Sequence, residues 1–125
     1  MDIYREEILD NYKHPKNYGK LTSSNASWHE ENTSCGDALD LTVSVKDGKV
    51  QDIKFEGVGC AVSVASASML YDRVKGMSIL EIKKIVKEEV LANFGETMTS
   101  GRIKCALLSY NALNKLIESY EKGKK

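Results

Sequence analysis

The chain has 125 residues, of which 42% are hydrophobic and one is proline, and this composition excludes a disordered protein and predicts a domain able to bury a core. Its 18 basic and 18 acidic residues balance, so no overall field favours nucleic acid or an anionic membrane as a partner. The first residues lack the basic and apolar regions of a signal peptide, and no apolar run approaches the roughly 18 residues of a spanning helix. We therefore expect a single domain over residues 1–125, cytoplasmic, with neither a membrane nor a nucleic acid as partner.

The first part of the chain is predicted to form a helix followed by a polar loop. Apolar residues recur at helical spacing from Asp2 to Lys13, and the pair His14-Pro15 ends the pattern. Residues 16–32 are rich in Ser and Asn, which indicates a loop that holds a short strand near Trp28.

A β-hairpin is the clearest structural signal in the sequence. Hydrophobic and polar residues alternate from Leu39 to Lys46, as they do in a strand with one buried face. Asp47-Gly48 follows, a dipeptide that favours a two-residue hairpin turn. Residues 50–55 then supply the returning strand.

The second half of the chain is predicted to be mainly helical. A helix over residues 61–75 ends at Gly76, and the Ser78-Ile79-Leu80-Glu81 capping box opens a helix that runs to about Val90. Residues 91–102 are predicted to be irregular, and a last amphipathic helix covers 103–120. Together these elements predict an α+β fold, in which a small antiparallel sheet of about three strands packs against several helices.

Three isolated cysteines carry the strongest chemical signal, because each stands at the predicted end of an element. Cys35 lies in a tight turn two residues before Asp37, Cys60 begins a predicted helix, and Cys105 begins another beside Lys104. An odd number of cysteines without an export signal fits a reducing compartment, where thiols stay available. Three thiolates and a carboxylate are the ligands that a four-coordinate metal or a small iron–sulfur cluster needs.

Each of these residues also has a simpler interpretation. Free cysteines are often buried packing residues, and Asp37 can serve as a turn or strand-end hydrogen-bond acceptor. Lys104 can lower the pKa of Cys105 only if the two side chains converge, and it can equally be a solvated surface residue. His14 and His29 are further candidate ligands, although surface histidines are the commoner case. None of the cysteines forms a C-x₂-C pair, which argues against a small zinc finger.

The sequence resembles the IscU/NifU-type iron–sulfur scaffold proteins over nearly its whole length. The resemblance rests on an N-terminal pattern from Tyr4 to Gly19 and on three cysteine segments in the same order. These segments are Asn32-Thr33-Ser34-Cys35-Gly36-Asp37, Phe55-Glu56-Gly57-Val58-Gly59-Cys60-Ala61-Val62-Ser63 and Lys104-Cys105-Ala106-Leu107-Leu108.

The resemblance implies an α+β scaffold on which a [2Fe–2S] cluster is assembled and then passed to recipient apo iron–sulfur proteins. It implies that a cysteine desulfurase supplies the sulfur, and that zinc can occupy the same residues. Carried over to this chain, Cys35, Cys60 and Cys105 are similar to the ligands, Asp37 to the fourth ligand, and Cys105 to the thiol that accepts persulfide sulfur.

The chain departs from the IscU pattern at two places. Lys104 stands where many IscU proteins have histidine, and it resembles the SufU branch of zinc-dependent sulfur acceptors, although the insertion typical of that branch is absent. Met98-Thr99-Ser100-Gly101-Arg102 replaces the Leu-Pro-Pro-Val-Lys segment that a dedicated Hsp70-type chaperone recognises, so the resemblance does not extend to that chaperone.

Three functions follow from these features. The first is a scaffold without turnover of its own, and the second is a zinc-dependent sulfur acceptor, which would be a sulfurtransferase. The third is a structural zinc-binding interaction module.

Overall fold

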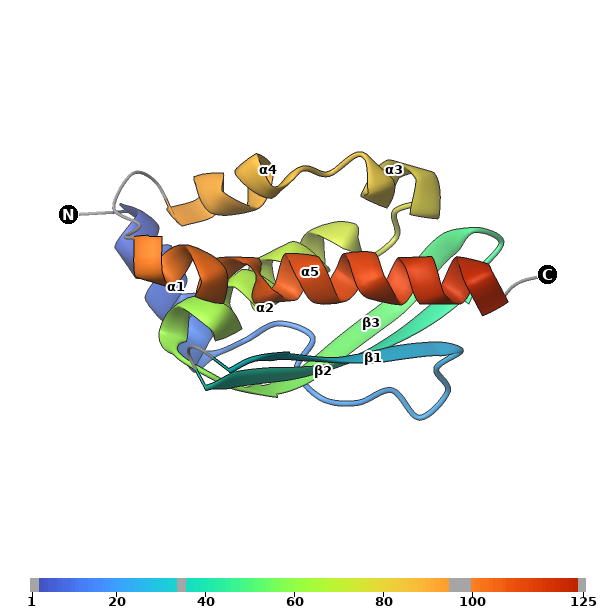
Figure 1. Cartoon of the computed structure of the whole chain (residues 1–125), viewed down its shortest axis with the longest axis horizontal. Helices are drawn as coiled ribbons and strands as arrows, with labels where there is room; N and C mark the ends of the chain where they lie inside the picture. The colour runs from blue at the N-terminus through green and yellow to red at the C-terminus, as the bar shows by residue number, and fades with distance from the viewer. Residues whose placement is uncertain (1–2, 34–35, 95–99, 124–125) are drawn as a thin grey trace.

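The computed structural model describes residues 3–33, 36–94 and 100–123, and Figure 1 shows how their elements are arranged. Three strands and several helices follow one another along the chain. In order they are α1 (Ile3–Lys13), β1 (Ala26–Asn32), β2 (Asp37–Lys46), β3 (Lys49–Val58), α2 (Ala61–Val74), α3 (Ile79–Lys83), α4 (Lys87–Leu91), the 3₁₀ helix η1 (Ala92–Phe94) and α5 (Ser100–Gly123).

The strands form one antiparallel sheet in the order β1-β2-β3, which confirms the predicted sheet and its hairpin. The turn between β2 and β3 places Asp47 and Gly48 at φ angles of 54° and 74°. Positive φ at both central residues defines the turn whose twist suits a tight hairpin, and glycine and aspartate tolerate it. β1 is a full strand of 7 residues rather than a short one inside a loop, and it pairs along β2 from Ala26↔Val43 to Asn32↔Asp37.

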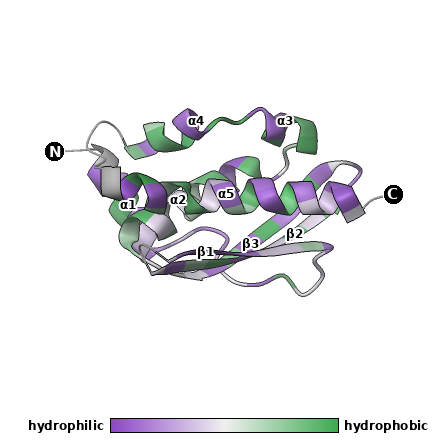
Figure 2. Cartoon of the chain, viewed as in Figure 1, coloured by the Kyte–Doolittle hydropathy of each residue, from purple (hydrophilic) through white to green (hydrophobic). Residues whose placement is uncertain are grey.

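Helices α2 and α5 cover one face of the sheet, and α3 and α4 lie on their far side (Figure 1). Along α5 hydrophobic positions alternate with hydrophilic ones, as Figure 2 shows. The apolar sides of the strands and of these two helices meet in the main core, because burial of this surface drives the packing. Its largest fully buried side chains include those of Leu41, Val43, Ile53, Phe55, Tyr71, Val74, Leu113 and Leu116.

The prediction of one helix from Ser78 to Val90 is wrong, because the segment forms two short helices. The predicted capping box is present: the Ser78 hydroxyl accepts the Glu81 N–H, and the Glu81 carboxylate accepts the Ser78 N–H. Val86 nevertheless adopts extended angles of φ −108° and ψ 157°, and its N–H donates to the Glu89 carboxylate at 2.9 Å. The β-branched pair Ile85-Val86 favours extended backbone, and Glu89 stabilises the new helix start.

The last helix begins earlier than predicted. We expected residues 91–102 to be irregular, but 92–94 form a 3₁₀ turn and α5 already includes 100–102. Gly101 lowers the intrinsic helix propensity there, whereas serine at a helix start favours it. Residues 95–99 lie outside the described part of the chain.

Several elements begin at one end of the molecule, on the left in Figure 1. β2, α2 and α5 all start there, so residues far apart in the sequence are brought together. Among the helices of the described residues, none has both the length and the apolar character that crossing a bilayer demands.

Candidate metal centre

Three potential ligands predicted from the sequence meet where β2, α2 and α5 begin. Asp37 is the first residue of β2, Cys60 immediately precedes α2, and Cys105 lies in the second turn of α5. A carboxylate oxygen of Asp37 and the Sγ atoms of Cys60 and Cys105 all lie within 4.8 Å of one another. Cys35, the remaining predicted cysteine ligand, lies outside the described residues.

Asp37 is held in place by the first turn of α2. Its carboxylate is only 3% exposed, and Oδ1 accepts the Cys60 N–H at 3.3 Å while Oδ2 accepts the Ser63 hydroxyl at 2.5 Å. An acidic side chain at a helix start often accepts such free N–H groups, and here the acid comes from a strand instead of from the helix itself. The hydrogen bonds compensate for the burial of the carboxylate.

Two glycines before Cys60 allow the chain to approach Asp37 closely. A Cβ atom on Gly59 would lie 2.8 Å from Asp37 Oδ1 and 3.2 Å from the Cβ of Ser63. A Cβ atom on Gly57 would lie 2.8 Å from the backbone oxygen of Ala38. The two distances of 2.8 Å are too short for a real Cβ atom, so glycine is needed at position 57 for the sheet and at position 59 for the ligand cluster.

The position of Cys60 at the helix start favours its thiolate. Its backbone is extended, with φ −75° and ψ 170°, and the free N–H groups of the first helical turn follow it. Burial raises the pKa of the Cys60 thiol, but hydrogen bonds, led by that from the backbone N–H of Ser63, outweigh it, so the pKa lies below its usual value. A half-buried thiol of lowered pKa is suited to metal binding.

Cys105 and Lys104 point in different directions from α5. Successive residues of a helix are turned by about 100°, so neighbouring side chains diverge. Cys105 is 4% exposed, whereas Lys104 is exposed and borders a hollow of about 310 Å³ together with Glu30 and Glu31. A role for Lys104 in promoting the Cys105 thiolate therefore stays a prediction.

Ser63 is a site residue that the predicted ligand set leaves out. Its hydroxyl donates to Asp37 and lies 3.7 Å from the Cys60 Sγ atom. The only sequence signal was its spacing of three residues after a cysteine at a helix start. This spacing places a side chain back over the first residue of the helix.

The described donors fit zinc. A tetrahedral zinc ion with Zn–S bonds of about 2.3 Å needs ligand atoms roughly 3.5–4 Å apart. The ligand atoms of Asp37, Cys60 and Cys105 lie within 4.8 Å of one another, near enough to share one ion, and the close approach at Gly59 keeps the space around the carboxylate free of a side chain. Two sulfur atoms and one oxygen are donors that zinc accepts, and Cys35 would complete the set.

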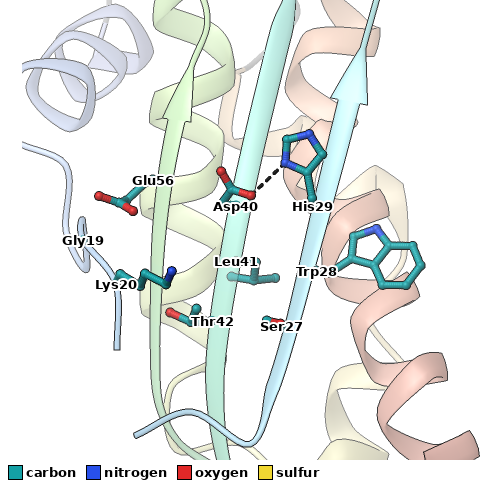
Figure 3. Close-up of a pocket in the computed structure, with 9 residues that line it drawn as sticks. All are labelled: Gly19, Lys20, Ser27, Trp28, His29, Asp40, Leu41, Thr42 and Glu56. Atoms are coloured by element: carbon teal, nitrogen blue, oxygen red, sulfur yellow. Dashed lines mark hydrogen bonds and ion pairs between the residues drawn. The ribbon is translucent and has the colours of Figure 1, made fainter. Parts of the chain in front are cut away.

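His29 contributes to a different part of the surface. His29 lies on the sheet face that the helices leave open, and there its Nδ1 is 2.7 Å from Asp40 Oδ1 and its Nε2 is 2.9 Å from Glu31 Oε1. It borders a hollow of about 470 Å³ that also includes Lys20 and Glu56 (Figure 3). Carboxylates engage both ring nitrogens of His29, so the hollow has a mixed-charge lining. Neither Cys60 nor Cys105 lines it.

Comparison with known proteins gives a consistent family match. Residues 3–125 match the model of the NifU-like N terminal domain. The chain is 37% identical to the zinc-dependent sulfurtransferase SufU of Bacillus subtilis, over 97% of this chain and 93% of the relative. It is 38% identical to the iron-sulfur cluster assembly scaffold protein IscU of Thermotoga maritima, over 90% of this chain and 79% of the relative.

Solved structures agree with the sequence relatives. A crystal structure of a putative iron-sulfur cluster assembly scaffold protein for the SUF system, from Fervidobacterium islandicum, matches with a TM-score of 0.80 and 27% identity, over 90% of this chain and 94% of that one. A nitrogen-fixing NifU-like protein (N-terminal) from Brucella abortus matches with a TM-score of 0.82 and 23% identity, over 96% of this chain and 95% of that one, which supports the fold alone.

Proposed function

The chain belongs to the family of NifU-like N-terminal domains, and from that premise we propose that it assembles and transfers iron–sulfur clusters as a single scaffold domain. The observation that carries the proposal is the convergence of Asp37, Cys60 and Cys105 at the shared start of three elements. With Cys35 they would form a site of three thiolates and one carboxylate.

A mixed donor set suits temporary binding of a [2Fe–2S] cluster, which is cargo here. Thiolates match iron–sulfur clusters well, whereas a carboxylate oxygen is a harder and less well matched donor. Asp37 would therefore be the weakest ligand, and its loss would open the cluster to a recipient. The hydrogen bonds from Cys60 and Ser63 would then stabilise the freed carboxylate.

Sulfur delivery would be a thiol–persulfide exchange. The Cys105 thiolate would attack the outer sulfur of a persulfide on the donor protein, forming an S–S bond at Cys105 and releasing the donor cysteine as thiolate. The exchange has no net oxidation, because one S–S bond replaces another. Cys105 is buried, so the donor would have to open the start of α5 to reach it.

A zinc-dependent sulfur acceptor is the second candidate, favoured by Lys104 and by the 37% identity to the B. subtilis sulfurtransferase. Bound zinc would hold the cysteine ligands as thiolates. The alignment with that relative nevertheless spans 138 positions, more than the 125 residues of this chain, so the relative contains residues that this chain lacks. The alignment with the T. maritima scaffold spans 112 positions, which is within the length of this chain, and it requires no such additional residues.

A scaffold of this type implies a sulfur donor and recipients of finished clusters. We propose a cysteine desulfurase as the donor and apo iron–sulfur proteins as the recipients. In this role the protein is a carrier rather than an enzyme. A cytoplasmic location, expected from the odd number of cysteines in the sequence, is part of the same proposal.

Anaerobic reconstitution with iron and a desulfurase tests these functions. We expect a visible [2Fe–2S] chromophore in the wild type, its loss in Cys60→Ser and Cys105→Ser, and its transfer to an added apo-ferredoxin. Zinc-dependent stimulation of the desulfurase without a chromophore would instead establish the sulfur acceptor. Tight zinc binding with neither activity would contradict both and leave the structural module.

A further inference from the structure

Ser63 lies between two of the proposed ligands. Its Oγ is 2.5 Å from Asp37 Oδ2 and 3.7 Å from the Cys60 Sγ. The Ser63 residue is only 6% exposed, so water cannot readily take the place of its hydroxyl. A serine has one hydroxyl proton, and the short distance to the carboxylate assigns that proton to Asp37.

The Asp37 carboxylate is fixed by two different donors. Oδ1 accepts the Cys60 N–H and Oδ2 accepts the Ser63 hydroxyl, so the carboxylate plane cannot rotate without losing one of them. Each carboxylate oxygen has two lone-pair positions, so one oxygen can bind a metal while both hydrogen bonds remain. The Ser63 hydroxyl therefore orients the carboxylate without competing with the metal.

We infer that Ser63 is a positioning residue, whose hydroxyl sets the orientation in which Asp37 acts as the fourth ligand; this rests on the metal site of the proposed function. Without the hydroxyl, the longer bond from Cys60, at 3.3 Å, is the one that Asp37 keeps among the described residues, and its carboxylate can turn away from the thiols. Groups that hydrogen-bond a metal ligand typically change metal affinity by about 10–100-fold when removed.

The test compares Ser63→Ala and Ser63→Thr with a matched control, Ser68→Ala. Ser68 is a fully buried serine of the same helix, but its hydroxyl contacts Asn11 and Lys16 of the N-terminal segment instead of a ligand. Zinc affinity is measured by competition with a chromophoric chelator. The coordination geometry is followed through the visible bands of Co²⁺ bound in place of zinc.

We expect Ser63→Ala to weaken zinc binding by about 10–100-fold and to give a Co²⁺ spectrum that matches the one to be measured for Asp37→Ala, which lacks the carboxylate. Ser63→Thr keeps the hydroxyl and should restore affinity and spectrum. Ser68→Ala should lower thermal stability and leave both readouts unchanged.

Specific outcomes would overturn the inference. Wild-type affinity and spectrum in Ser63→Ala, or the same changes in Ser68→Ala, would refute a positioning role while leaving the metal site intact. Failure of the wild type to bind zinc or Co²⁺ would instead overturn the metal site and the inference with it.

Discussion

Gly59 keeps the ligand cluster open, because no larger residue fits beside Asp37. We predict that Gly59→Ala weakens zinc binding by about 10–100-fold, since its Cβ would lie 2.8 Å from Asp37 Oδ1 and push the carboxylate aside. Zinc competition assays measure the effect. Unchanged affinity in Gly59→Ala would contradict this account.

Gly57→Ala is the matched control for that substitution. Its Cβ would press on the Ala38 backbone oxygen in the sheet rather than on a ligand. We expect a loss of about 1–3 kcal/mol in unfolding free energy, as in other overpacked sites, with zinc affinity retained by the folded protein.

His29 links two acidic residues on the open sheet face and gives the stability of the protein a defined pH dependence. The His29 ring donates hydrogen bonds to the carboxylates of Glu31 and, second, Asp40, and these raise the pKa of His29 above its usual value of 6.5. The protonated form is therefore favoured in the folded state. Its contribution is fully present below pH 6.5 and is lost as the pH rises through the raised pKa.

We predict that the stability difference between wild type and His29→Gln shrinks as the pH rises from about 6 to about 8. Urea denaturation across this range measures it. Because both acids raise the pKa of His29, the variant with Glu31→Gln and Asp40→Asn should lose this pH dependence as His29→Gln does. A difference that stays constant with pH would exclude His29 as its source.

At the scale of elements, a buried hydroxyl group joins the two helices that cover the sheet. Ser66 of α2 is 1% exposed, and its hydroxyl donates to the Ala106 carbonyl of α5 at 2.6 Å and lies 3.0 Å from the Ser109 hydroxyl. We predict that Ser66→Ala lowers the unfolding free energy by about 1 kcal/mol, the usual net value of one such bond. Chemical denaturation tests this, with the exposed Ser119→Ala as control; equal stabilities would argue against the link.

The elements that could be predicted are those whose signal is local. The β2–β3 hairpin follows from alternation and from Asp47-Gly48, and both ends of α2 follow from flanking glycines. β1 had a weak signal, because its residues Ala-Ser-Trp-His-Glu-Glu-Asn are mostly polar and their strand conformation depends on pairing with β2. The break between α3 and α4 at Val86 has no local signal either, because apolar residues continue at helical spacing across it.

The site was only partly predictable, because its residues are distant in the sequence and their contacts leave no local signal. Cys60 could be identified as an element end, whereas Cys105 lies further inside α5 than predicted. The spacing along the chain contains no information that the two thiols converge. The family resemblance supplied that expectation. Ser63 became visible only when the Asp37 carboxylate was placed over the first turn of α2.

For the whole molecule, the proposed ligands connect one strand of the sheet to both covering helices. A ligand that binds only the folded state stabilises it, by about 2.7 kcal/mol at a concentration 100 times its Kd. We predict that zinc at about 100 times its Kd raises the free energy of unfolding by this amount. The whole domain should unfold in one shifted transition, because the donors belong to three elements.

Thermal denaturation with zinc and with a chelator measures the shift. The variant Cys60→Ser with Cys105→Ser should unfold at the same temperature in both conditions. A zinc effect that persists in this variant would place the ion elsewhere.

The location of Cys105 on the final helix has a consequence for biosynthesis. A ribosome releases the hairpin and α2 first, so Asp37 and Cys60 emerge while α5 is still untranslated. An ion captured at that moment would meet an incomplete set of donors and could exchange freely. Stable loading would therefore have to wait until α5, which supplies Cys105, has been translated.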